Sequence, residues 1–403
     1  MSMSGMSSMV AARWRMAKRL VRSRMPEAIT SRIGPATARY RPQDVPAPVA
    51  APATDVRLLV GPRNFAGQGD RWARAAERLP GVGAVSMIAG DNGGLDFPVD
   101  YGVPDAVYTN SRRWGIRQRD AVGAGFTHVM IEAVSSMFGA ASDKVVAREV
   151  EWLRAQGVQV AMLCHGTDIR LPDRHAQLDE WSPFRDAPAD WVNRLQTRAS
   201  FNQQVLDRVA APVFVSTPEM LLDRPGAQWL PIVVDIERWV TSTEILTSDR
   251  PVVLHAPTNP LVKGTALIEP IVQRLHEARQ IDYRRVVRVP SGEMPALYAG
   301  ADVVLEQFAL GMYSVTSVEA MAAGRIAIAH VHDQVRDHVR ETTGLELPVV
   351  EATPDTLHDV LDDIRTRPEH YREVAHRGPD FVRAVHDGAL SARVLAPFLG
   401  VTA

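Results

Sequence analysis

The segment GMYSVTSVEAMAAG, residues 311–324, is the richest group of side chains that could do chemistry. Its polar start, with Tyr313 and Ser314, precedes a predicted helix, and Glu319 lies about one turn inside that helix. Free N–H groups at a helix start can bind an anion, and a carboxylate can accept hydrogen bonds from a diol such as that of a ribose. A carboxylate among Ala, Met and Val is costly without a partner, so the segment predicts a ligand site.

A lysine marks a second candidate site. The predicted strand 251–256 is followed by PTNPLVKGT, in which Lys263 comes just before a predicted helix. A lysine charge beside the oriented N–H groups of a helix start suits a diphosphate. The order Lys-Gly, without a leading glycine, is not a Walker A loop. A solvated surface lysine is the alternative interpretation.

A third group of polar residues follows the predicted strand 158–163, where the chain reads CHGTD. His165 and Asp168 lie at the carboxyl end of this strand and could contact a hydroxyl group or stabilise developing positive charge. A structural histidine is the alternative. Glu132, at the end of another strand, is a weaker candidate of the same kind, and we expect Cys164 to pack rather than to react.

The first predicted strand runs into GPRNFAGQGD, residues 61–70, and then into a helix. In this loop Asn64, Gly67 and Gly69 allow a tight turn and a close approach of the backbone to a ligand. Trp72 occupies the third glycine position of a dinucleotide fingerprint, which excludes that motif. An ordinary strand-to-helix turn is the alternative to a functional loop.

Motifs for metal-dependent and hydrolytic chemistry are absent from the sequence. No two aspartates are separated by one residue, and there is no HExxH, GxSxG or EF-hand pattern. The one histidine cluster, HVHD at 330–333, is predicted to be a solvated loop. We therefore expect no metal and no cofactor.

The net charge and the cysteine count limit which partners and which cellular compartment we expect for the protein. A formal net charge of -2 gives no support to a nucleic-acid partner. The one cysteine excludes an intrachain disulfide framework and fits a reducing cytoplasm. The arginine-rich N-terminus is not a secretory signal, because its charges follow rather than precede the apolar stretch. We expect a solvated tail, with peripheral contact of residues 10–24 at the inner face of the membrane as the alternative.

The candidate residues need regular elements to position them. Short apolar or β-branched runs predict strands at 56–60, 84–88, 127–132, 158–163, 212–216, 251–256, 283–289, 301–307 and 325–331. Amphipathic stretches predict helices at 70–79, 142–157, 265–279, 293–300, 316–324 and 388–399. Strands that alternate with helices indicate parallel sheets in two successive α/β domains. In such sheets ligands bind at the carboxyl ends of the strands.

Three strings together carry a resemblance to a known family. KGT at 263–265, ADVVLEQ at 301–307 and GMYSVTSVEAMAAGRIAIAH at 311–330 resemble the donor domain of family 4 retaining glycosyltransferases. NFAGQGD, HGTD and STPEM…WLPIVVD are weaker matches in the first half. The resemblance implies an α/β GT-B fold, in which two Rossmann-like domains face each other across a cleft and the last helix crosses back. The implied division is a basic extension and Pro/Ala-rich linker at 1–54, an acceptor-side domain at 55–235, a donor domain at 236–387 and a returning helix at 388–403.

The resemblance also implies a reaction and roles for residues. A sugar would pass from a nucleotide diphosphate sugar to an acceptor hydroxyl with retention of configuration and without a metal. Lys263 would hold the donor diphosphate, with backbone groups at Tyr313 and Ser314 assisting and Gly311 beside them. Thr258 is added to this set as our own candidate, and Glu319 would bind the ribose hydroxyls. His165 and Asp168 would lie near the reacting centre, which the loop with Asn64, Gly67 and Gly69 would border.

The sequence departs from the family pattern at two points. The earlier member of a glutamate pair eight positions apart is here Gly311, and the nearby Glu306 need not substitute for it. The arginine common before the lysine is absent from 257–260, where Thr258 is our candidate for a partial replacement. Because of these departures, a non-catalytic partner subunit that binds a sugar nucleotide is one alternative function. A sugar-nucleotide epimerase of the same architecture is a second alternative.

An active glycosyltransferase would use a carbohydrate, a lipid-linked or a small-molecule acceptor. We would expect it to act in the synthesis of a surface polysaccharide, a glycolipid or a glycosylated metabolite.

Overall fold

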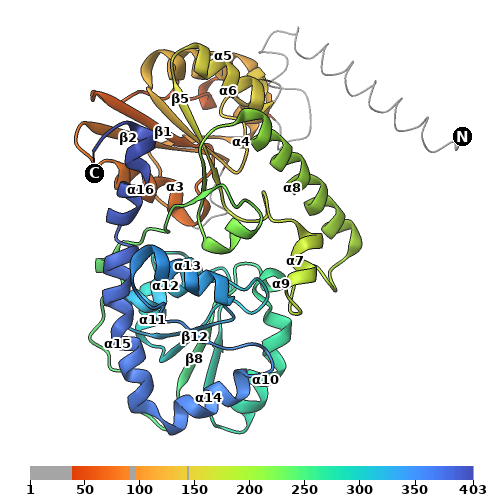
Figure 1. The fold of residues 1–403 in the computed structure, drawn as a ribbon, viewed down its shortest axis with the longest axis vertical. Helices are drawn as coiled ribbons and strands as arrows, with labels where there is room; N and C mark the ends of the chain where they lie inside the picture. Colours follow the sequence, from red (N-terminus) through yellow and green to blue (C-terminus); the bar gives the residue numbers. More distant parts are fainter. Residues whose placement is uncertain (1–38, 91–96, 143–144, 403) are drawn as a thin grey trace, which may run out of the picture.

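The computed structural model describes residues 39–90, 97–142 and 145–402. They form two α/β domains, one above the other in Figure 1, each built on a parallel sheet. The first sheet has the strand order β3-β2-β1-β4-β5-β6-β7 and the second has the order β12-β11-β10-β8-β9. The expected α/β fold with two Rossmann-like sheets is confirmed. Residues 10–24 lie outside the described residues.

The elements of the first domain alternate as the sequence predicts. Its strands are β1 Val56–Gly61, β2 Val82–Ala89, β3 Tyr101–Val103, β4 His128–Glu132, β5 Gln159–Cys164, β6 Val213–Val215 and β7 Gln228–Trp229. Its α-helices are α3 Gln68–Ala76, α4 Asp105–Asn110, α5 Arg112–Gly125, α6 Val146–Ala155, α7 Pro172–Leu178 and α8 Ala189–Val209. The stretch predicted as a linker packs against this domain, since Tyr40 and Val49 are buried in its core.

The second domain has the same alternation. Its strands are β8 Val252–His255, β9 Asp282–Arg285, β10 Val303–Leu305, β11 Ile326–Ala329 and β12 Val350–Glu351. The helices that follow are α9 Pro260–Lys263, α10 Thr265–Glu277, α11 Met294–Ala299, α12 Val315–Ala322, α13 Asp333–Thr343, α14 Leu357–Thr366, α15 Pro368–Val385 and α16 Ala389–Leu399. The three strands missed from sequence, β3, β7 and β12, are two or three residues long and lie at sheet edges, where no long apolar run is needed.

The C-terminal helix returns to the first domain, as the resemblance implied. In Figure 1, α15 runs along the second domain and α16 continues upward to lie against the first. Leu395 and Leu399 of α16 are buried in one apolar cluster with Leu58 of β1 and Trp72 of α3. The side-chain N–H of Trp72 donates to the carbonyl of Pro231, which ties α3 to the segment that leads into the second domain. Across the described part of the chain, no helix has both the length and the apolar character to cross a membrane.

Candidate active site

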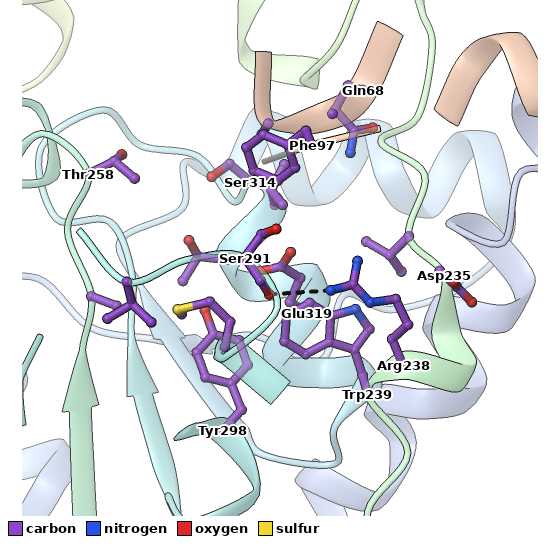
Figure 2. A pocket seen from close by; sticks show the side chains of 18 of the residues that line it. Gln68, Phe97, Asp235, Arg238, Trp239, Thr258, Ser291, Tyr298, Ser314 and Glu319 are labelled. Carbon is purple, nitrogen blue, oxygen red and sulfur yellow. Dashed lines mark hydrogen bonds between the residues drawn. The ribbon is translucent and has the colours of Figure 1, made fainter. Parts of the chain in front are cut away.

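A cleft of about 740 Å³ lies between the two domains. The first domain lines it with the loop before α3 and the segment 233–235; the second lines it with the residues after β8 and β9 and the start of α12. These are the carboxyl ends of parallel strands and the helix starts that follow them, where ligands of open α/β sheets bind. Figure 2 shows side chains of both domains converging on this space. Of the residues singled out from sequence, the cleft is lined by Gly67, Thr258, Lys263, Ser314 and Glu319.

Glu319 of α12 faces the cleft as an isolated carboxylate. Figure 2 labels it with Ser291 and Arg238 among the side chains that line the cleft, and the charge of Arg238 acts on it. Among the described residues none forms a hydrogen bond with its carboxyl group, and the side chain is partly buried. Burial raises the pKa of Glu319 to about 8, against the opposing charge of Arg238. An acceptor that protein groups leave unsatisfied is what a hydroxylated ligand would pair with.

The cleft is lined by four cationic side chains, three of which the sequence interpretation missed. Lys263 was expected, and Arg71 of α3, Arg238 and Arg288 join it. Arg71 is 3.8 Å from the Asp235 carboxylate, and Arg238 donates to the carbonyl of Ser291 at 3.3 Å (Figure 2). The four cations outnumber the acidic residues Asp235 and Glu319, and the raised pKa of Glu319 leaves its carboxyl group largely protonated at neutral pH, so the cleft is positive and suits an anionic ligand.

The position of Arg288 corrects one predicted strand. The stretch 283–289 was predicted to be a strand throughout, but β9 ends at Arg285. Arg288 takes a φ of +57°, which breaks the extended conformation, and Arg288 and Ser291 line the cleft. By residue type these cleft arginines cannot be told from surface arginines. The sequence offered a signal in position alone, because Arg71 comes just after the glycine loop and Arg238 lies near the predicted domain boundary.

Lys263 is held by Glu306, which the sequence interpretation left without a role. The Lys263 ammonium donates to the Glu306 carboxylate at 2.9 Å and to the Ser314 hydroxyl at 3.3 Å. Glu306 also accepts the Ser314 N–H at 3.1 Å and the hydroxyls of Ser314 and Ser317. Burial acts to raise the pKa of Glu306, but the Lys263 charge and these donors hold it below its usual value. The carboxylate therefore stays ionised and fixes Lys263 at the edge of the cleft.

The same network corrects the expected role of the Ser314 backbone. Its N–H was expected to assist a diphosphate, but it donates to Glu306 instead. Only the Ser314 side chain remains beside the cleft. Thr258 is exposed on the cleft wall, and its role as a partial replacement for an arginine stays a prediction.

Gly311 and Tyr313, expected to contact the diphosphate, do not line the cleft. Tyr313 is buried, and its hydroxyl lies 3.3 Å from Nε2 of His386. Gly311 has a φ of +63°, and a Cβ built on it would lie 2.2 Å from the ring of His332. The imidazole of His332 therefore occupies the space that a side chain at 311 would need. A larger side chain at position 311, such as that of a glutamate, would collide with this ring.

Replacing Gly311 by alanine is therefore expected to cost more than backbone strain alone. Gly324→Ala is a matched control, because Gly324 has the same φ of +63° with its nearest neighbour 3.9 Å from the built Cβ. We expect Gly311→Ala to lower the free energy of unfolding by about 1 kcal/mol more than Gly324→Ala, measured by urea denaturation. In a His332→Ala background the two substitutions should cost the same. If both substitutions lowered the unfolding free energy equally in the chain that retains His332, crowding of position 311 by this imidazole would be contradicted.

His165 and Asp168 lie at the predicted strand end but outside the cleft lining. The Asp168 carboxylate is buried and accepts the backbone N–H groups of His165 at 3.0 Å and Gly166 at 2.6 Å. It therefore shapes its own turn, and the direct catalytic role expected for it is not what this geometry provides. His165 Nε2 lies 3.1 Å from the carboxylate of Glu132, and Phe65 packs edge-on against the imidazole. Burial raises the pKa of Glu132, and His165 opposes that shift.

Of the three residues predicted in the glycine loop, one lines the cleft and the other two hold the loop in its conformation. Gly67 lines the cleft with a φ of +74° at the N-cap of α3. A Cβ on Gly69 would lie 2.9 Å from the carbonyl of Arg63 and 3.0 Å from Glu132, so glycine lets the start of α3 approach that carboxylate. Asn64 is buried; it donates to the carbonyl of Pro98 and accepts from the N–H of Asp70. Asn64 and Gly69 thus hold the loop in place.

Comparisons with known proteins agree on the fold. No protein-family model matches the sequence, and no curated protein matches it. The structure of sucrose-phosphate synthase from Thermosynechococcus elongatus matches with a TM-score of 0.54 at 14% identity, over 84% of this chain and 97% of that chain. The structure of Anabaena HepE in complex with UDP and glucose matches with a TM-score of 0.53 at 13% identity, over 86% and 99% of the two chains. With the two facing sheets and the returning helix, these matches show that the chain has the GT-B glycosyltransferase fold.

Proposed function

We propose that this protein is a glycosyltransferase that takes its sugar from a nucleotide diphosphate sugar. The observation that carries the proposal is the interdomain cleft, in which four cations and one unpaired carboxylate line the carboxyl ends of two parallel sheets. A nucleoside diphosphate has the matching chemistry, with two phosphates for the cations and a ribose diol for the carboxylate. The HepE structure, which holds UDP and glucose in the same fold, supports this choice of ligand class.

In this proposal the second domain binds the donor. Lys263, Arg238 and Arg288 neutralise the diphosphate as it departs, and the Thr258 hydroxyl adds a hydrogen bond. Glu319 binds the ribose hydroxyls. Because these side chains supply the positive charge at the leaving group, the reaction needs no catalytic metal. Retention of configuration is part of the proposal through the resemblance to family 4 enzymes.

The first domain supplies the acceptor side. Arg71 and the Gly67 backbone face the donor from across the cleft. His165, oriented by Glu132 from behind, is the residue we propose to contact the transferred sugar when the Phe65 ring moves off it. The acceptor hydroxyl would belong to a carbohydrate, a lipid-linked sugar or a small molecule, in the synthesis of a surface polysaccharide, glycolipid or glycosylated metabolite.

A thermal-shift panel with UDP, GDP, ADP and TDP tests the donor site. We expect one nucleotide to raise the melting temperature by several degrees, equally with and without magnesium, because a bound ligand stabilises the folded state by mass action. Glu319→Ala should lose the shift, and Arg393→Ala, an exposed residue on α16, should keep it. A shift with none of the four nucleotides would contradict the proposal.

The stereochemistry of the reaction is a separate test. The anomeric configuration of the product, read by NMR, tests retention. Sugar epimerisation without an acceptor would identify an epimerase instead.

A further inference from the structure

A second polar contact joins the two domains outside the cleft lining. Asp179 follows α7 in the first domain, and His330 and His332 follow β11 in the second. Oδ2 of Asp179 lies 3.5 Å from Nε2 of His330 and 3.0 Å from Nε2 of His332. The three side-chain atoms all lie within 4.8 Å of one another. A buried carboxylate and two imidazoles from different domains thus point at one place.

The spacing of these atoms matches that of ligands around a small metal ion. Zinc binds imidazole nitrogen and carboxylate oxygen at about 2.0–2.2 Å, which places neighbouring ligands of a tetrahedral site roughly 3.3 Å apart. The two separations from Asp179, 3.0 Å and 3.5 Å, lie on either side of this value. Two histidines and one aspartate would leave one tetrahedral position open for water.

The groups behind these side chains are arranged as supporting groups of a metal site are. Nδ1 of His330 lies 2.8 Å from the Glu351 carboxylate, which directs Nε2 toward Asp179. Glu351 is itself held by Arg336 at 2.9 Å and by the N–H of Val331 at 2.9 Å. A carboxylate on the second nitrogen of a ligating histidine fixes its tautomer and makes it a better ligand.

The other two side chains are fixed as well. Oδ1 of Asp179 accepts the N–H of Trp181 at 2.7 Å, so Oδ2 is the oxygen that faces the histidines. The N–H of His332 donates to the carbonyl of Gly311 at 3.0 Å, and its ring fills the space left by the missing side chain of that glycine. Phe184, Leu310 and Met312 form a nearby apolar cluster made of residues from both domains. These contacts therefore hold the side chains of Asp179, His330 and His332 in fixed orientations before any ion binds.

We propose that Asp179, His330 and His332 bind a divalent transition-metal ion that fastens the first domain to the second. Such an ion would not touch a donor diphosphate, because none of its three ligands lines the cleft. The ion would hold the domains together and take no part in the proposed sugar transfer, which still needs no catalytic metal. From the sequence alone, a solvated loop was predicted at 330–333; in this proposal the same residues contribute two ligands to a site between the domains.

The test uses the full-length chain, stripped with a chelator and titrated with ZnCl₂ by calorimetry. We expect one zinc ion per chain and a rise in melting temperature of several degrees. Cobalt(II) should give visible absorption bands typical of a four-coordinate site. Because the ion joins two domains, zinc should also slow amide hydrogen exchange in 175–182 and 329–333 together.

Variants locate the site. His330→Ala, His332→Ala and Asp179→Asn should each lower zinc affinity at least hundredfold, and Glu351→Gln should lower it about tenfold. His358→Ala, which removes a half-exposed imidazole from α14, is the matched control and should bind zinc as the unaltered chain does. If a histidine variant fails to fold, Asp179→Asn and Glu351→Gln still decide the question, since both keep the side-chain volume. No stoichiometric binding of zinc or cobalt, or unchanged affinity in these variants, would overturn the proposal.

Discussion

Lys263→Met should lower the affinity for the nucleotide diphosphate and the transferase activity by about tenfold to hundredfold. A hydrogen bond from a charged donor contributes roughly 1.5–3 kcal/mol, which corresponds to that range. The ammonium lies on the cleft wall, held by Glu306 at 2.9 Å, so its position is set before any ligand binds. Calorimetry with the nucleotide identified in the thermal-shift panel measures the affinity, and initial rates measure the activity.

The same substitution should destabilise the protein, and a second variant separates the two effects. Without Lys263, the fully buried Glu306 carboxylate loses its counter-charge, which we expect to cost about 3 kcal/mol of unfolding free energy. Lys263→Met combined with Glu306→Gln removes both charges and should recover most of the stability. Nucleotide affinity should stay low in this double variant. Recovery of affinity together with stability would mean that Lys263 supports the fold and does not bind the ligand.

Glu319→Gln should make the protein more stable at pH 8 while leaving it almost unchanged near pH 4. Burial raises the pKa of Glu319 to about 8 in the folded chain, whereas a glutamate in an unfolded chain has a pKa of about 4.3. Between these values the folded state binds more protons than the unfolded state, so stability falls as the pH rises. Glutamine carries no titrating proton and escapes this loss. The difference in unfolding free energy should grow by about 1 kcal/mol per pH unit, read from urea denaturation at pH 4 to 8.

The functional effect of removing this carboxyl group should run the opposite way. Glu319→Ala should lower activity at least tenfold, because the ribose loses its acceptor. Glu346→Gln is the matched control, since its carboxylate is largely exposed and should change neither activity nor the pH dependence of stability. If removing the Glu319 carboxyl group raises stability and lowers activity, the role of this residue is to bind the ligand rather than to stabilise the fold. Full activity in Glu319→Ala would contradict the ribose assignment.

Much of the architecture could be predicted because it depends on local patterns. The apolar runs at 56–60 and 251–256 coincide with β1 and β8, and the chain turns at their carboxyl ends toward the cleft. Lys263 and Glu319 were identified for the same reason, since a charged residue at a helix start or among apolar neighbours is unusual by itself. The short edge strands were missed because two or three residues carry no periodic signal.

The sequence by itself therefore determined the parallel-sheet architecture and the two residues on which the donor-site proposal depends. Only the tertiary structure decided the partners of those residues, because partners are brought together by the packing of distant segments. It joined Glu306 to Lys263, placed Arg71 and Arg238 in the cleft, and moved Tyr313 out of it. It also brought Asp179 within 3.0 Å of His332, 153 positions further along the chain. No spacing rule within one segment encodes such a contact, which depends on how the two domains meet.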